Sequence, residues 1–110
     1  MLIGISGCKK TTDPICNEWT FYIPNAFEPN ANGLNDTFEP RGTGVNSFAM
    51  WIFDNTGKQI FYTTDINAGW NGAVQGSINI CPQGYYPYKI TATDACGYNH
   101  TYTGSVILLK

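Results

Sequence analysis

The sequence predicts an all-β domain, an immunoglobulin-like β-sandwich of about seven strands. Three observations support this prediction. Short runs of aromatic and β-branched residues alternate with turn residues along the chain. No window of about 11 residues keeps its apolar residues at helical spacing. The composition, with 15% aromatic residues and 12 glycines, favours strands and turns.

The size and charge of the chain limit the classes of function that it can have. A length of 110 residues and a net charge of -2 fit one domain and leave no basic surface for nucleic acid. Apolar residues make up 43% of the chain, enough for one core. No stretch approaches the roughly 20 apolar residues of a membrane-spanning helix. These values exclude a nucleic-acid-binding protein and a disordered chain.

The N-terminal residues 1–16 are predicted to be a leader and tether, and residues 17–110 the folded domain. Ile5-Ser6-Gly7-Cys8 resembles a bacterial lipobox, whose cysteine becomes lipidated after cleavage, so Cys8 is a candidate lipidation site. Only Leu2 to Ile5 provide an apolar stretch before it, so an accidental match or an upstream truncation stays open. The polar "KKTTDP" that follows is typical of a tether.

The first two predicted strands are Trp19 to Ile23 and Asp36 to Pro40, each marked by aromatic residues. Between them, residues 27–38 read "FEPNANGLNDTF". Asn and Asp side chains bond their own backbone and tolerate left-handed conformations. We therefore expect a rigid corner between two sheets, held by Phe27 and Phe38.

The next predicted strands form a hairpin. In Ser47 to Phe53 both alternating faces are apolar, which is typical of a central strand. Asp54-Asn55-Thr56 enters a turn, Gly57 supplies a positive φ, and Gln59 to Thr63 is the return strand.

Two long strands and one weak strand complete the prediction. Ser77 to Ile80 is the weak strand, and His100 to Leu109 is the last. Tyr85 to Thr93 is predicted to be unpaired or bulged at Pro87, which has no N–H to donate. Its core-facing residues are expected to be Tyr86, Tyr88, Ile90 and Ala92.

Five segments resemble one known family when they are taken in order. They are "IPNAFEPNANGLNDTFEPRG", "FAMWIFDNTGKQIFYT", "GWNG", "QGYYPYKITATDACG" and "GSVILLK". From Ile23 to Lys110 the chain is similar to the type B C-terminal sorting domain of the bacterial type IX secretion system, also called the gliding motility-associated C-terminal domain. The resemblance implies an immunoglobulin-like fold, recognition by outer-membrane secretion and attachment machinery, and a place at the cell surface or outer membrane. It implies neither catalysis nor a cofactor.

The resemblance also implies a set of sorting-motif residues. They are Pro29, Asn30, Gly33, Asn35, Asp36, Gly57, Trp70, Gly72, Gly84, Gly104 and Lys110. The chain departs from the family pattern in its loop, where an acidic residue and a glycine are missing, and at Asn71, where the family usually has aspartate.

Calcium is a weak alternative for the loop between Phe27 and Phe38. Its candidate ligands are Asn30, Asn32, Asn35 and Asp36. Calcium takes six to eight oxygens with several carboxylates, and this set offers one carboxylate among amides. A structural corner is the favoured interpretation, and no metal or cofactor is predicted.

The four cysteines predict one disulfide, between Cys16 and Cys96. Cys81 and Cys96 flank a predicted strand of about nine residues, so they would lie roughly 30 Å apart, too far for a bond. Cys16 enters a first strand that can lie parallel to the last, which begins just after Cys96. Cys81 is then a buried or free thiol.

The alternatives belong to other classes of protein. An enzyme is not expected, because the only histidine, His100, lies at a strand start and is predicted to be a surface side chain. A glycan-binding module would use exposed aromatic platforms, and the candidates are Trp19, Trp51, Trp70, Tyr62, Tyr85, Tyr98 and Tyr102. A third interpretation is an outer-membrane lipoprotein that uses this fold for docking.

Overall fold

The computed structural model describes residues 19–30 and 36–110. These residues form strands and turns without a helix, which confirms the all-β prediction. The strands are β1 (Thr20–Tyr22), β2 (Ala26–Phe27), β3 (Arg41–Thr43), β4 (Val45–Phe53), β5 (Gln59–Thr63), β6 (Gly84–Asp94) and β7 (Asn99–Leu108). Within the described ranges, no helix is long and apolar enough to span a membrane.

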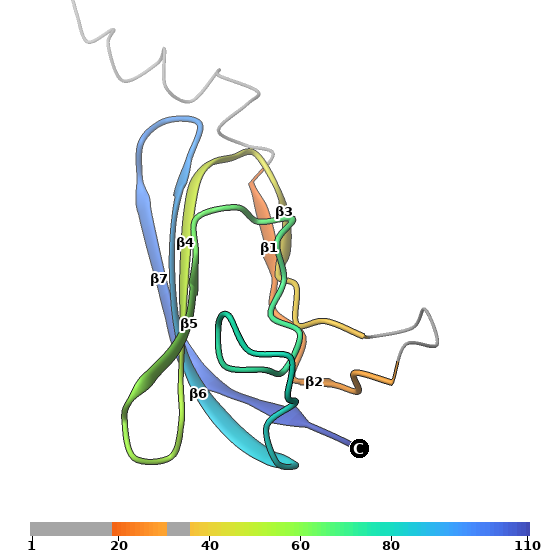
Figure 1. Ribbon diagram of the computed structural model, residues 1–110. Coiled ribbons are helices and arrows are strands. Elements are labelled where there is room, and N and C mark those ends of the chain that lie inside the picture. Colours follow the sequence, from red (N-terminus) through yellow and green to blue (C-terminus); the bar gives the residue numbers. More distant parts are fainter. Residues whose placement is uncertain (1–18, 31–35) are drawn as a thin grey trace, which may run out of the picture.

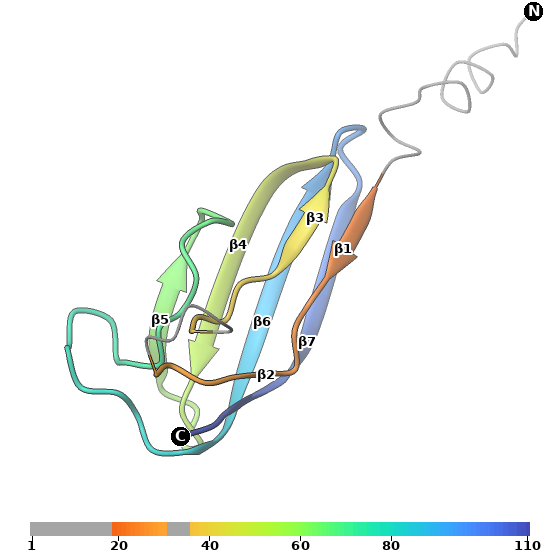
Figure 2. The ribbon, with the colours of Figure 1, turned by 90° about the vertical axis from the view of Figure 1, so that its right-hand side faces the viewer.

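The strands form two layers, as predicted for a sandwich (Figure 1). One layer is a five-stranded sheet in the order β2-β7-β6-β4-β5, and the other is the antiparallel pair β1-β3. In the larger sheet only β2 and β7 run parallel. Figure 2 shows β1 and β3 lying across the face of the large sheet, so the core is enclosed between the layers.

The centre of the large sheet agrees with the sequence pattern. β4 pairs with β5 on one side and with β6 on the other, so it is an internal strand of the sheet, in agreement with its two apolar faces. Its side chains at Phe48, Met50 and Ile52 are buried. The members of the core cluster are Phe27, Phe38, Phe48, Met50, Ile52, Ile60, Trp70, Tyr86, Ile90, Val106 and Leu108.

The turn between β4 and β5 has the predicted chemistry. Gly57 has a φ of 90°. Asp54 Oδ1 accepts hydrogen bonds from the backbone N–H groups of Thr56 and Lys58, at 2.9 and 3.0 Å. The carbonyl of Asp54 also accepts the N–H of Gly57 at 3.0 Å. A short aspartate side chain therefore organises the reversal that joins the two strands.

Pro87 lies in β6 without a bulge. It stands opposite Ser105 in a continuous β6–β7 register. The ladder between β6 and β4 ends one residue later, at Tyr88. The predicted lack of pairing at Pro87 is therefore correct on the β4 side and wrong on the β7 side.

Two predicted strands are wrong. Asp36 to Pro40 forms only an isolated bridge between Phe38 and Trp70, since Pro40 has no N–H to extend the ladder. Ser77 to Ile80 forms only the bridge of Ile80 with Ala73. There the hydroxyl of Ser77 accepts the N–H of Asn79 at 3.1 Å, which favours a local turn.

The expected corner between the sheets is present at its two ends. β2 belongs to the five-stranded sheet and β3 to the two-stranded sheet, so the chain between them changes layer. The rings of Phe27 and Phe38 lie 6.3 Å apart. Residues 31–35, in the middle of the corner, lie outside the described residues.

Candidate functional site

The C-terminal strand is held from both sides near its end. The backbone N–H of Ile107 donates to the carbonyl of Asn25, just before β2, and the N–H of Leu109 donates to the carbonyl of Phe27 in β2, both at 2.9 Å. The N–H of Lys110 donates to the side-chain oxygen of Gln83 at 3.1 Å. The last residues of the chain are therefore ordered by contacts with segments far away in the sequence.

Trp70 anchors the loop that leads from β5 to β6. Its backbone exchanges two hydrogen bonds with Phe38, at 2.8 and 3.1 Å. Its indole Nε1 donates to the carbonyl of Ala73 at 2.7 Å, which satisfies the polar atom of a fully buried ring. The indole packs between the rings of Phe27 at 5.3 Å and Tyr86 at 5.2 Å.

Gly72 lies where this loop meets the C-terminal strand. Its φ is 94°, in the left-handed region that favours glycine. A Cβ at Gly72 would lie 3.2 Å from Leu108 Cδ1, 3.3 Å from Ile80 Cγ2 and 3.4 Å from Pro29 Cγ. We call Phe27, Pro29, Trp70, Gly72 and Leu108 the C-terminal cluster. Three predicted sorting-motif residues thus come together with β7 although they are far apart in sequence.

The other sorting-motif residues lie in several places. Gly57 is in the β4–β5 turn, and Gly104 is within β7 against the ring of Tyr88. The backbone of Asn30 donates to the carbonyl of Glu28 at 2.9 Å. Gly33 and Asn35 lie outside the described residues, as does the calcium candidate Asn32.

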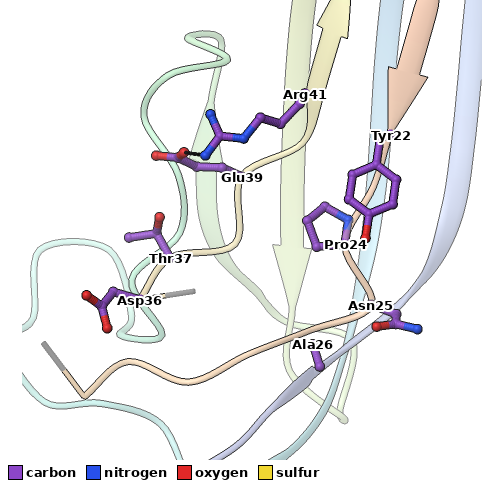
Figure 3. A pocket seen from close by; sticks show the side chains of 8 residues that line it. All are labelled: Tyr22, Pro24, Asn25, Ala26, Asp36, Thr37, Glu39 and Arg41. Carbon is purple, nitrogen blue, oxygen red and sulfur yellow. Dashed lines mark ion pairs between the residues drawn. The ribbon is translucent and has the colours of Figure 1, made fainter. Parts of the chain in front are cut away.

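Asp36 lines a groove of about 710 Å³ that separates two segments of the chain (Figure 3). One wall carries the ion pair of Arg41 with Glu39, with 3.0 Å between Nη2 and Oε1. The opposite wall consists of Tyr22, Pro24, Asn25 and Ala26. The lining offers hydrogen-bonding groups and both signs of charge, and it carries no histidine, cysteine or serine that would act as a nucleophile or base.

The turn between β6 and β7 repeats the chemistry of the β4–β5 turn. Asp94 Oδ1 accepts the N–H groups of Cys96 and Tyr98 at 2.9 and 3.0 Å. Asp94 Oδ2 lies 3.1 Å from His100 Nε2. The hydrogen bond with His100, together with those from the backbone, lowers the pKa of Asp94.

His100 is not the surface side chain that the sequence predicted. The side chain is 27% exposed and pairs with Asp94. Its ring also stacks on Trp19, with centroids 4.0 Å apart and planes inclined by 13°. The imidazole therefore joins the start of β7 to the residue that precedes β1.

The two described cysteines differ in state. Cys81 is a free, half-buried thiol whose pKa is raised by burial. Cys96 follows Asp94 in the β6–β7 turn and is not a free thiol. Cys8 and Cys16, the candidates for lipidation and for the disulfide, lie outside the described residues.

The aromatic residues suggested for glycan binding have mostly other contacts. Trp70 is in the core, Tyr102 stacks on Phe21 at 5.1 Å, and Trp19 stacks on His100. Trp51 packs against Tyr62 and lies under the ammonium of Lys89. The exposed members are Tyr62, Tyr85 and Tyr98, at 38%, 68% and 53%.

Sequence reasoning missed three features of this site. It missed the ion pair of Glu39 with Arg41, the pairing of Asp94 with His100, and strand β2. The repeated Asp-x-x-Gly of residues 54–57 and 94–97 was the available signal for the second turn. No local signal marks β2, which has two residues.

Comparison with known families gives one match. A family model of the CHU_C type IX secretion signal domain matches residues 21–108. A search of curated proteins found no match to the chain.

Proposed function

Because the chain belongs to the CHU_C type IX secretion signal domain family and is thereby a sorting signal for export, we propose that the secretion machinery recognises the surface around its C-terminal strand. The family match confirms the resemblance inferred from the sequence. The observation that carries the proposal is that Pro29 and Gly72 meet Leu108 of β7, while Trp70 packs on Phe27, the strand partner of Leu108.

The contacts around this strand support a composite surface. Phe27, Trp70, Gly72 and Leu108 of the cluster are buried, so they position the exposed residues around them and do not form the surface themselves. The cluster joins the segment after β2, the loop after Trp70 and the last residues of β7, so the exposed residues beside it come from three distant parts of the chain. Leu109 and Lys110 extend beyond the cluster and are exposed. A receptor that contacts them would detect the folded state of the domain, because contacts with Phe27 and Gln83 hold these two residues in place.

The test is export of a reporter fused before the domain in a bacterium with type IX secretion. Deleting residues 104–110 removes much of β7 and should abolish folding or surface display. Lys110→Glu keeps the backbone bond to Gln83 and should lower export while the melting temperature stays unchanged. The matched control is Lys89→Glu, the same charge reversal on the large sheet. Normal display of the deletion variant, or equal export of both charge variants, would contradict the proposal.

The domain is further proposed to act without catalysis. His100 pairs with Asp94 and stacks on Trp19, and burial raises the pKa of the Cys81 thiol, which disfavours the nucleophilic thiolate. Neither arrangement provides a nucleophile with a base and an orienting acid. Hydrolysis of generic ester, peptide or glycoside substrates by the purified chain at rates above those of a Cys81→Ser/His100→Ala variant would overturn this proposal.

Export implies an extracytoplasmic or cell-surface location, and attachment to the outer membrane is the finer proposal. We assign residues 1–16 to a leader or tether and residues 17–110 to the domain. Cys8 is the proposed lipidation site if the lipobox is used. The mass of the mature N-terminus from native cells tests it, because lipidation adds acyl chains to Cys8 and removes the residues before it.

A disulfide between Cys16 and Cys96 is also proposed. The N-terminal segment contacts β7 at a constant spacing of 81 residues. The three contacting pairs are Trp19 with His100, Phe21 with Tyr102, and Ala26 with Ile107. Continued toward the N-terminus, the same spacing would match position 16 with position 97, which supports a bond between Cys16 and the neighbouring Cys96.

The bond would close a loop of about 80 residues and stabilise the fold by roughly 4 kcal/mol in the chain-entropy model. Cys81 is not available to Cys96, because the continuous strand β6 separates them. Non-reducing peptide mapping of protein from the cell envelope should find a Cys16–Cys96 peptide. A Cys8–Cys96 peptide, or free thiols at both Cys16 and Cys96, would show that the pairing is wrong.

A further inference from the structure

One edge of the five-stranded sheet is blocked by a side chain. At β5, the amide of Gln75 takes the place of a neighbouring strand: its Oε1 accepts the N–H of Tyr62, and its Nε2 donates to the carbonyl of Tyr62, both at 3.0 Å. The N–H of Gln75 also donates to the carbonyl of Ile60 at 2.8 Å. An added strand would have to displace these bonds, so this edge is protected.

The opposite edge, at β7, is covered only near its end. Ile107 and Leu109 direct their N–H groups to the segment of β2, so the odd-numbered residues of β7 point their backbone groups away from β6. β2 is two residues long and therefore covers only the C-terminal part of this edge.

The same edge continues through Thr101, Thr103 and Ser105. No described residue forms a strand with their outward backbone groups, because β2 is the only described neighbour of β7 on that side. Their side chains are exposed, small and uncharged. The register with β6 is continuous, so no bulge twists the edge away. Lysine, proline and bulges are the usual protections of an exposed edge, and this segment has none of them.

We propose that the export machinery binds this open edge, residues 101–105, by adding a strand of one of its own proteins to β7. The proposal rests on the sorting function above, because a sorting signal must be recognised by another chain. Strand addition supplies affinity through backbone hydrogen bonds and specificity through alternate side chains. The added strand would also lie on the same edge of β7 with which β2 already pairs.

The surroundings of the edge define the chemistry of the partner strand. On the outer face it would lie beside Thr101, Thr103 and Ser105, which suits small β-branched or hydroxyl side chains. On the inner face it would lie near Phe21, which stacks on Tyr102, so apolar side chains are expected there. No charged side chain points from residues 101–105, so the partner strand needs no compensating charge.

The decisive variant is Thr103→Pro. It removes one outward N–H and places a ring in the path of an added strand, while the bonds between β7 and β6 come from the even-numbered residues. We expect export of the reporter fusion to fall at least about tenfold. The reason is that the partner strand would lose one hydrogen bond to β7 and could not approach it closely. Circular dichroism and the melting temperature of the purified variant establish that it folds. The control is Gln75→Ala, which opens the β5 edge and should leave export unchanged.

A photocrosslinking amino acid provides a second measurement that does not require the proline variant to fold. Placed at position 103, it should form an adduct with another protein in exporting cells, whereas placed at Tyr62 on β5 it should not. Export of a folded Thr103→Pro variant at the wild-type level would overturn the proposal. Adducts only between two copies of the chain, only within one chain, or equal at both positions would also overturn it. Failure of the unaltered fusion to be exported would instead refute the sorting function.

Discussion

Replacing Gly104 by alanine should destabilise the domain, although alanine is usually the better residue in a strand. Gly104 stands opposite Tyr88 in the β6–β7 ladder, and the tyrosine ring lies across it. A Cβ at position 104 would lie 2.8 Å from Tyr88 Oη and 3.0 Å from Cζ. The ring is also held by Phe38, with centroids 5.4 Å apart, so it cannot move freely away.

The magnitude follows from two opposed effects. Overpacking a well-filled site costs about 1 to 3 kcal/mol, whereas replacing a strand glycine by alanine contributes about 0.5 to 1 kcal/mol in favour of the fold. Together the two ranges give a net loss of about 0 to 2.5 kcal/mol in the free energy of unfolding, with about 1 kcal/mol as the central value. For a domain of this size, a loss of about 1 kcal/mol is a fall in melting temperature of about 4 to 8 °C.

The assay is urea unfolding followed by tryptophan fluorescence. Ser105→Ala is the control, since its side chain is exposed and makes no such contact. Tyr88→Phe removes the atom nearest to the new methyl group, so the double variant should lose less than the sum of the two single changes. An unchanged or higher unfolding midpoint for Gly104→Ala would show that the ring shifts without cost and that this reasoning is wrong.

Four further predictions concern other parts of the fold. Gly57→Val should lower the free energy of unfolding by about 1 to 3 kcal/mol, because a β-branched residue is strained at a φ of 90°; thermal unfolding beside Thr56→Val is the check. Trp70→Phe should cost about 2 to 4 kcal/mol in urea unfolding, since it leaves a cavity and the carbonyl of Ala73 without its donor. The pKa of Asp94 is lowered in the fold from 3.8, so its carboxylate stabilises the domain above that pH and this contribution is lost as the pH falls through the lower folded value; urea midpoints measured from pH 6 to pH 2 should fall more for the wild type than for Asp94→Asn. Burial raises the pKa of Cys81, so its alkylation at pH 8 should be slower than that of a free cysteine peptide, and equal rates would contradict its half-buried position.

The long strands could be predicted from sequence because they carry their own periodicity. In β4 and β6 the alternation of residues such as Met50 and Ile90 reports burial directly, and the Asp-x-x-Gly signal marks the turn at Gly57. Strands β2 and β3 have two and three residues, too few to show a period. They exist because of pairing with β7 and β1, a tertiary effect that local sequence does not contain.

The candidate site, like the fold, combines residues that could be predicted from sequence with contacts that depend on the tertiary structure. Trp70 and Gly72 were predicted from the family resemblance, but the approach of Gly72 to Leu108 depends on how the loop crosses the end of the large sheet. The role of Gln75 at the β5 edge was missed because a side chain that imitates a strand has no sequence signature. His100 was misjudged because Asp94 reaches it across the β6–β7 turn, and because Trp19 meets it only when the segment before β1 packs against β7.

The contact of the earliest strands with the last strand bears on when the domain can fold. β2 pairs with β7, and Phe21 of β1 stacks on Tyr102 of β7, in both cases about 80 residues later in the sequence. Such distant contacts make folding slow and dependent on the whole domain. During synthesis, β2 must wait for its partner until β7 has left the ribosome. We therefore expect that a cargo truncated anywhere before β7 carries no formed signal. The fold itself would then restrict export to chains that carry the whole domain, β7 included.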